Sequence, residues 1–145
     1  MPPPGSVIMI VEDDPPIREL MQCLLQDEGY SVVSAPNGRE AVDCALQCQP
    51  ALVVLDLGLP LRDGVQVANI LRQLQGPETE LIVVSADLEA PQKAAEVGAS
   101  VLIEKPFDLD DLLDAVSRVM KRHASVGVMQ PSDRDSYASR EVAAV

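Results

Sequence analysis

The sequence predicts an α/β protein built around a parallel β-sheet. Five short apolar runs rich in Val, Ile and Leu alternate along the chain with segments whose apolar residues recur at helical spacing. The runs show no polar alternation, which is typical of parallel strands buried on both faces. Parallel strands need crossover connections, so helices are expected to cover both faces of the sheet. A chain of 145 residues fits one domain of ordinary size.

The first half of the chain supplies three strands and two helices. Strands are predicted over 7–11, 31–35 and 51–55. Asp14 and Pro15 are residue types of an N-cap and a first helical position, and Gly29 is a residue type that ends helices. Asn37 and Glu40 have the spacing of a capping box, so a second helix is expected to begin there.

The second half supplies two strands and three helices. Strands are predicted over 81–84 and 101–103. A loop through Pro60 and Gly64 precedes the third helix, and a short Ala-rich helix is expected to stop near Gly98. Asp108 is a candidate cap for a last helix whose apolar residues lie on one face.

This alternating pattern is confined to the middle of the chain. We expect a leader over 1–6, one domain over 7–122 and a flexible tail over 123–145, where Gly, Ser, Pro and charged residues replace the pattern. The longest apolar stretch is interrupted by Asp56, and no basic region of a secretory signal follows the start. The single histidine, His123, lies in the tail, which argues against a phosphohistidine donor.

Charge and cysteine content narrow the possible partners. The chain has 23 acidic against 11 basic residues, a net charge of −12. Nucleic acids and anionic membranes both select clustered Lys and Arg, so we expect neither as a partner. Cys23, Cys44 and Cys48 are expected to be reduced in a cytoplasmic protein. Cys44 and Cys48 have a spacing conceivable for a shared metal, but no His or second cysteine pair completes such a site.

Chemically active residue types follow four of the predicted strands. They are Glu12, Asp13 and Asp14 after the first strand, Asp56 after the third, Ser85 after the fourth and Lys105 after the fifth. In a parallel sheet these ends share one edge, where the functional crevice lies. Carboxylates gathered there repel one another, and Mg²⁺ relieves the repulsion. Such a cation and Lys105 can carry the charge of a transferred phosphoryl group, which a carboxylate can accept.

Each of these residues also has a structural interpretation. The acidic run 12–14 can complement a helix dipole, and we assign Asp14 to capping. Asp56 alone can be a turn residue, Ser85 an ordinary strand end and Lys105 a solvated charge. Because all of these residues are expected at one edge of the sheet, in this order along the chain, phosphoryl chemistry is favoured.

Four segments together resemble the response regulator receiver family over residues 7–121. They are IVEDDP at 10–15, LVVLDLGLP at 52–60, VVSA at 83–86 and EKPF at 104–107. Each motif alone is weak evidence for the family, but the four motifs together are specific to it. The resemblance implies a doubly wound five-stranded parallel sheet in strand order 2-1-3-4-5, with helices on both faces, as in chemotaxis regulators. It also implies a cis peptide bond between Lys105 and Pro106, against the general preference for trans.

The resemblance implies a role for each site residue. The expected Mg²⁺ ligands are Asp13, Asp56 and the backbone carbonyl of Gly58, with Glu12 assisting through water. Asp56 is expected to accept the phosphoryl group. Ser85 is expected to hydrogen-bond that group on activation, and Lys105 to pair with it.

Three positions depart from the family pattern. Asp14 adds a third carboxylate to the usual acidic pair, and Leu59 stands where Met is frequent. Leu102 occupies the position in the fifth strand where the family commonly has an aromatic switch residue. We therefore expect the change on phosphorylation to be confined largely to residues 85–105.

Two other functions remain as alternatives. A haloacid-dehalogenase-like phosphatase also uses an Asp nucleophile and Mg²⁺, but it needs a second Asp where this chain has Gly58. A degenerate receiver that only binds partners would not need the full set of site residues found here. The chain is expected to be a free-standing receiver, and a piece of a larger regulator is the alternative.

The expected partners follow from the resemblance. A sensor histidine kinase or a histidine phosphotransfer protein would supply the phosphoryl group, and a downstream protein would dock on the face made by the fourth helix, the fifth strand and the last helix. We expect a cytoplasmic monomer or weak dimer. It would not be an enzyme, apart from catalysing its own phosphorylation and dephosphorylation.

Overall fold

The computed structural model describes residues 7–58, 64–76 and 79–124. Strands and helices alternate throughout. The strands are β1 (Val7–Val11), β2 (Ser31–Ala35), β3 (Leu52–Asp56), β4 (Glu80–Ser85) and β5 (Val101–Glu104). The helices are α1 (Pro15–Asp27), α2 (Gly38–Cys48), α3 (Gly64–Gln75), α4 (Ala90–Glu96) and α5 (Leu109–Ala124).

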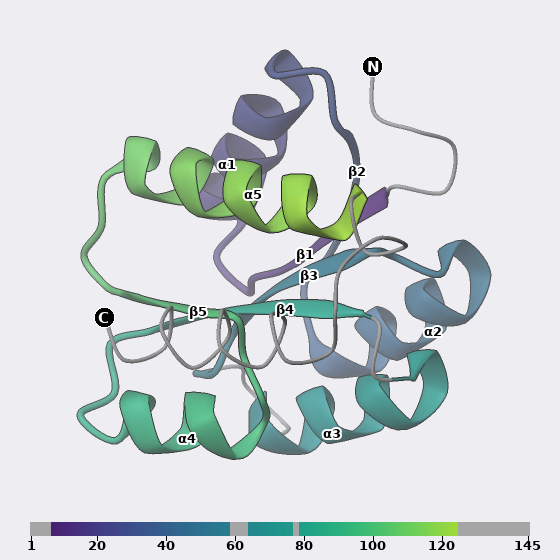
Figure 1. Ribbon diagram of the computed structural model, residues 1–145, viewed down its shortest axis with the longest axis vertical. Helices are drawn as coiled ribbons and strands as arrows, with labels where there is room; N and C mark the ends of the chain where they lie inside the picture. The colour runs from purple at the N-terminus through teal and green to yellow at the C-terminus, as the bar shows by residue number, and fades with distance from the viewer. Residues whose placement is uncertain (1–6, 59–63, 77–78, 125–145) are drawn as a thin grey trace.

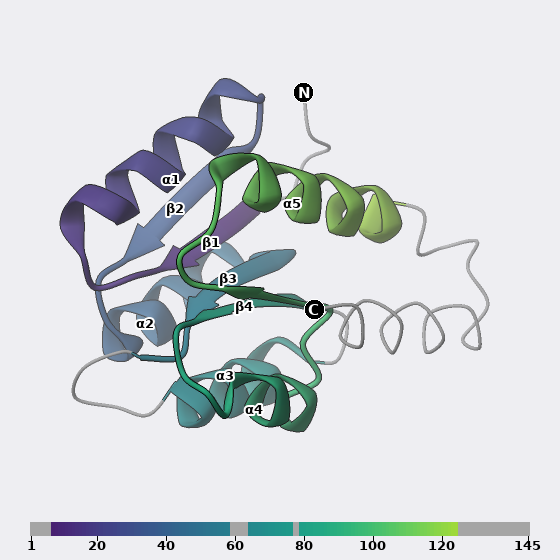
Figure 2. The same ribbon diagram turned by 90° about the vertical axis from the view of Figure 1, so that its left-hand side faces the viewer.

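All strand pairs are parallel, and the sheet has the order β2-β1-β3-β4-β5. Helices α1 and α5 cover one face, and α2, α3 and α4 cover the other (Figures 1 and 2). The predicted doubly wound fold and its strand order are therefore confirmed.

The two faces have separate aliphatic cores. Along β1, Met9 and Val11 pack in the core under α2, α3 and α4, while Ile8 and Ile10 pack in the core under α1 and α5. This alternation is the period of two of an extended strand. Both sides of each central strand are buried, which explains the continuous apolar runs in the sequence.

Element boundaries differ from the predictions by one residue at most strands. Strands β3, β4 and β5 each include the polar residue at the carboxyl end that the sequence placed just after the strand. The last helix continues to Ala124, two residues past the predicted domain end. The predicted leader, the rest of the predicted tail and Leu59 lie outside the described residues. No helix in the described part of the chain has the length and apolarity needed to cross a bilayer.

The predicted helix starts are partly correct. Asn37 caps α2, because its side chain accepts a hydrogen bond from the backbone N–H of Glu40 at 2.9 Å. Asp14 occupies the N-cap position of α1 as predicted, but its side chain makes no capping hydrogen bond. Pro15 and Pro16 fill the first two helical positions and have no N–H to donate, which reduces the need for a cap.

Candidate functional site

The carboxyl ends of β1 and β3 bring three carboxylates together. One oxygen each from Glu12, Asp13 and Asp56 lies within 4.8 Å of the others. Glu12 and Asp56 are buried, while Asp13 is exposed. They meet because β1 and β3 are neighbours in the sheet although they are distant in the sequence. The predicted acidic cluster is therefore present.

Lys105 supplies the positive charge of this cluster. Its Nζ lies 3.0 Å from Asp56 Oδ2 and 3.2 Å from Glu12 Oε1. The peptide bond between Lys105 and Pro106 is cis, as predicted. Burial lowers the pKa of Lys105, but the hydrogen bonds and charges of Asp56 and Glu12 outweigh burial, so the net pKa is raised. The lysine is therefore an ammonium group throughout the physiological range.

The surroundings of Glu12 destabilise its charged form. Its pKa is raised from 4.5 to about 7, first by burial and then by the nearby charge of Asp56, against the lowering effect of Lys105. Its other oxygen, Oε2, accepts the backbone N–H of Asp14 at 3.3 Å. The Arg18 side chain donates to the backbone carbonyl of Glu12 at 2.9 Å, which fixes the segment that carries the acidic run.

Asp56 is held in place by two donors. The backbone N–H of Gly58 donates to Oδ1 at 2.9 Å, and Lys105 binds Oδ2. A carboxylate can accept about four hydrogen bonds, so lone pairs remain on both oxygens for a metal or a phosphorus atom.

Helix α3 begins directly against the backbone that follows Asp56. A Cβ added at Gly64 would lie 2.5 Å from Leu57 Cα and 2.7 Å from its carbonyl oxygen. Only glycine allows this approach. The start of α3 is thus held close to the segment next to the phosphoacceptor candidate.

Ser85 connects the site edge to α4. It is buried at the end of β4, and its Oγ accepts the backbone N–H of Asp87 at 3.0 Å. Asp87 in turn accepts the backbone N–H of Glu89 at 2.8 Å and the Lys93 Nζ at 2.6 Å. The hydrogen bond from Lys93 holds the pKa of Asp87 below its ordinary value. A continuous set of hydrogen bonds therefore runs from Ser85 into α4.

Sequence reasoning missed part of this arrangement. The sheet topology placed Lys105 and Glu12 at one edge, but the salt bridge between their side chains, which joins residues 93 positions apart, was not predicted. The link from Ser85 through Asp87 to Lys93 was also missed, although a Ser and an Asp two residues apart are a common local turn pattern.

An apolar cavity adjoins the site between α1 and the loop after β5. Its volume is about 470 Å³, and its lining includes Ile17, Leu20, Met21, Lys105 and Phe107. Leu20 of α1 borders this cavity and is 51% exposed. Apolar side chains therefore gather in a hollow directly beside the buried ionic site.

Comparisons with known proteins identify the family of this chain. The family model of the response regulator receiver domain matches residues 8–117. A CheY-like receiver domain protein from Methanospirillum hungatei is 26% identical, with a TM-score of 0.77, covering 83% of this chain and 97% of its own. Chemotaxis protein CheY4 from Vibrio cholerae is 30% identical, with a TM-score of 0.73, covering 79% and 98%.

A third similar structure is response regulator TrrA from Thermotoga maritima in complex with Mg²⁺ and BeF. It is 31% identical with a TM-score of 0.70, and the match covers 79% of this chain and 98% of TrrA. The matched residues carry the acidic cluster, the lysine and the buried serine described above. This chain belongs to the response regulator receiver domain family of two-component systems.

Proposed function

We propose that this chain is a phosphoacceptor receiver in which Asp56 takes a phosphoryl group from a phosphohistidine. The observation that carries the proposal is the geometry around Asp56: a buried carboxylate bound to an ammonium at 3.0 Å and adjoined by two further carboxylates. In the transfer, a carboxylate oxygen of Asp56 attacks phosphorus, the P–N bond breaks, and the imidazole nitrogen keeps the electron pair.

The donor set fits Mg²⁺. Three carboxylates share a small region with one lysine, which leaves an excess of negative charge for a hard cation to offset. Asp13 and Asp56 would hold the ion, with the Gly58 carbonyl as a further oxygen ligand and Glu12 assisting. The bound cation would supply positive charge for the oxygens of the transferring group. The complex of the relative TrrA with Mg²⁺ and BeF supports this assignment.

Lys105 prepares the site for the incoming charge. Its ammonium contacts Asp56 and Glu12 before phosphorylation, and it lies next to the atom that becomes phosphorylated. A fixed donor aimed at developing negative charge lowers the barrier without reorganisation during the reaction. Hydrolysis by water then restores the carboxylate, so the chain acts catalytically only on itself.

The phosphoryl donor must contact the rim of the site. The apolar cavity beside Lys105 lies on that rim, between α1 and the loop after β5. We expect a helix of the kinase or phosphotransfer protein to pack an apolar side chain there, since this brings its phosphohistidine close to Asp56. Burial of the exposed Leu20 side chain would contribute to that contact.

The signal is expected to leave the site through Ser85. Its hydroxyl can donate to a phosphoryl oxygen, and its Oγ already accepts the N–H of Asp87, whose carboxylate binds Lys93 on α4. Leu102 is 1% exposed and packs in the core with Ala90 and Ala94 of α4. Because that position holds no aromatic ring, the change should stay within residues 85–105.

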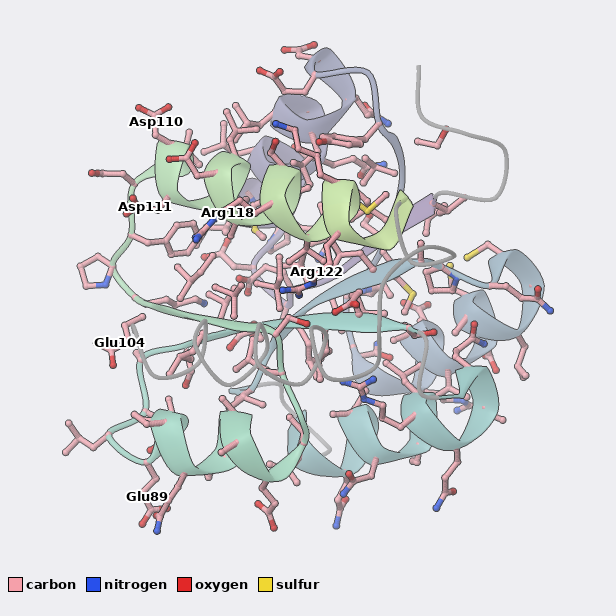
Figure 3. The ribbon with its side chains drawn as sticks, in the orientation of Figure 1. Glu89, Glu104, Asp110, Asp111, Arg118 and Arg122 are labelled. Carbon is pink, nitrogen blue, oxygen red and sulfur yellow. The ribbon has the colours of Figure 1, made fainter. Side chains whose placement is uncertain are left out.

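The output face is acidic at the end nearest the site. Glu89, Glu104, Asp110 and Asp111 lie at the ends of α4, β5 and α5 that border this face (Figure 3). A groove of about 400 Å³ between β5 and α5 has three acidic residues and one basic residue in its lining, namely Glu104, Asp111, Asp114 and Arg118. A downstream partner would therefore present basic side chains.

Labelling with acetyl phosphate tests the proposal. Intact-mass measurement should show one phosphoryl group on the wild-type chain in Mg²⁺, and none after chelation or in Asp56→Asn. Asp43→Asn, an exposed aspartate on α2, is the matched control and should label normally. Equal labelling of Asp56→Asn, or labelling that persists in chelator, would overturn the assignment.

A further inference from the structure

Arg18 joins α1 to the segment that carries the acidic run, and the proposed function gives it no role. Its Nη1 donates to the backbone carbonyl of Glu12 at 2.9 Å, and its own backbone N–H donates to the carbonyl of Asp14, also at 2.9 Å. Asp13 lies between these two carbonyls in the sequence. One residue of α1 therefore holds the main chain on both sides of Asp13.

The acidic run has left the sheet at this point. The backbone N–H of Glu12 still donates to the carbonyl of Ala35 on β2, at 3.1 Å. Asp13 and Asp14 are exposed, so packing does not fix them. The hydrogen bond from the Asp14 N–H to Glu12 Oε2 is longer, at 3.3 Å. The two hydrogen bonds from Arg18 are thus a main connection between this segment and the rest of the fold.

The first turn of α1 increases this dependence on Arg18. Pro15 and Pro16 occupy its first two positions and have no backbone N–H. They cannot hydrogen-bond back to the acidic run. The donors that join the run to the helix must therefore come from later residues, and Arg18 supplies two of them.

Arg18 differs from Lys105 in what its side chain binds. Lys105 contacts the carboxylates of Asp56 and Glu12, whereas the Arg18 guanidinium binds a main-chain carbonyl. In the described part of the chain, no salt bridge joins Arg18 to a carboxylate. Its positive charge would repel a cation in the cluster, so any favourable effect on Mg²⁺ comes through the position that it gives Asp13.

We propose that Arg18 is a positioning residue for the cation, and this inference rests on the proposed function of the acidic cluster as a Mg²⁺ site. Mg²⁺ demands near-ideal octahedral geometry, so its affinity depends on where the Asp13 carboxylate is held. Groups that orient metal ligands without touching the metal change affinity by about 10–100-fold. Arg18 acts in this way through the main chain.

Calorimetric titration of the unphosphorylated, full-length chain with Mg²⁺ measures this role directly. Arg18→Met should weaken Mg²⁺ binding about tenfold, although it removes a positive charge. Arg18→Lys keeps a donor on a flexible stem, so its affinity should fall between Arg18→Met and wild type. Arg39→Met is the matched control. It removes the same charge from the exposed start of α2 and should bind Mg²⁺ no more weakly than wild type.

A second readout separates positioning from loss of stability. In acetyl phosphate labelling, Arg18→Met should need about ten times more Mg²⁺ for its half-maximal rate and should regain the wild-type rate at saturating Mg²⁺. A variant that is only destabilised would lose labelled protein at every Mg²⁺ concentration. Thermal melting shows whether each variant is folded, and Arg18→Gln, with a shorter neutral side chain, replaces Arg18→Met if that variant unfolds.

The two proposals fail on different results. Mg²⁺ affinity in folded Arg18→Met or Arg18→Gln that equals or exceeds wild type would overturn the role of Arg18 alone. A wild-type chain that binds no Mg²⁺, or whose affinity Asp13→Asn leaves unchanged, would overturn the Mg²⁺ site itself and this inference with it.

Discussion

The two edges of the sheet carry ionic clusters that differ in charge balance, one with an excess of carboxylates and one neutral. At the carboxyl edge, Glu12, Asp13 and Asp56 share the single ammonium of Lys105. At the amino edge, the Glu80 carboxylate on β4 binds the Ser100 hydroxyl and the Arg122 guanidinium, the latter at 3.3 Å.

The amino-edge cluster, Glu80, Ser100 and Arg122, is complete within the chain. One carboxylate meets one guanidinium, and Arg122 reaches it from α5 across the sheet edge (Figure 3). Arg72 closes the same edge by donating to the carbonyls of Thr79 and Gly98, both at 2.7 Å. A cluster balanced in charge stabilises a structure, whereas an unbalanced one creates a demand for a cation or a reacting group. We therefore assign a structural role to the amino-edge cluster and a reactive role to the carboxyl-edge cluster.

Lys105→Met should give the largest effect. It removes the ammonium that contacts Asp56, so the rate of labelling by acetyl phosphate should fall about 10²–10³-fold, the cost of one preorganised donor. Stopped-time labelling with intact-mass detection measures the rate. Lys93→Met, which changes a lysine on α4 outside the carboxylate cluster, is the control. A rate within threefold of wild type would show that the lysine is not part of the reaction.

Arg122→Met should lower the stability of the fold and leave the labelling rate unchanged. It leaves the half-buried Glu80 carboxylate without its guanidinium, and the loss of such a charged hydrogen-bond partner costs about 1–3 kcal/mol of the free energy of unfolding. Urea denaturation measures this loss. Lys121→Met, at the exposed neighbouring position on α5, should change it by less than about 0.5 kcal/mol. The labelling rate of folded Arg122→Met should match wild type, and a large loss of rate would contradict the division of roles.

The pH dependence of stability should originate at the carboxyl edge. An acid with a raised pKa binds its proton more tightly in the folded state than in the unfolded state. The contribution of Glu12 to stability is therefore full below pH 4.5 and is lost as pH rises toward about 7. In chelator, the melting temperature of the wild-type chain should fall more between pH 5 and pH 8 than that of Glu12→Gln. Equal slopes for the two chains would contradict the burial of an unbalanced charge at this edge.

Ser85→Ala should have the smallest effect. It removes one hydrogen bond to the phosphoryl group, so affinity for beryllofluoride with Mg²⁺ should weaken about tenfold. The change in amide exchange over residues 85–105 should shrink, because the Oγ that accepts the Asp87 N–H is gone. Ser85→Thr keeps the hydroxyl and should behave like wild type. Unchanged exchange in Ser85→Ala would show that the signal leaves by another route.

The fold was predictable because its main determinants are local. Uninterrupted apolar strands such as 52–55 and periodic helices specify the layers, and the crossover rule brings the strand ends to one edge. The same rule predicted that Glu12, Asp56 and Lys105 would meet. Strand ends were misplaced by one residue because Asp56 and Ser85 are polar but still pair with neighbouring strands.

Side-chain partners were not predictable to the same extent. Residue preference placed Asp14 at the N-cap of α1, but its side chain makes no capping hydrogen bond, and Pro15 and Pro16 leave the first two helical positions without an N–H. The amino-edge cluster was missed entirely, since Glu80 and Arg122 stand 42 positions apart and each resembles an ordinary surface charge. Partners of this kind depend on packing between elements, which periodicity does not report.

Gly64 sets the spacing between α3 and the segment that follows β3 through contact of main-chain atoms. The volume that a methyl group would need is filled by Leu57 backbone atoms, and these cannot rotate aside as a side chain can. The backbones of the two segments are therefore in direct contact. A displacement of one segment must displace the other through this contact, without a hydrogen bond or a charge. Helix α3 is thus held at a fixed distance from the strand end that carries Asp56, on the same face of the sheet as the Ser85 link to α4.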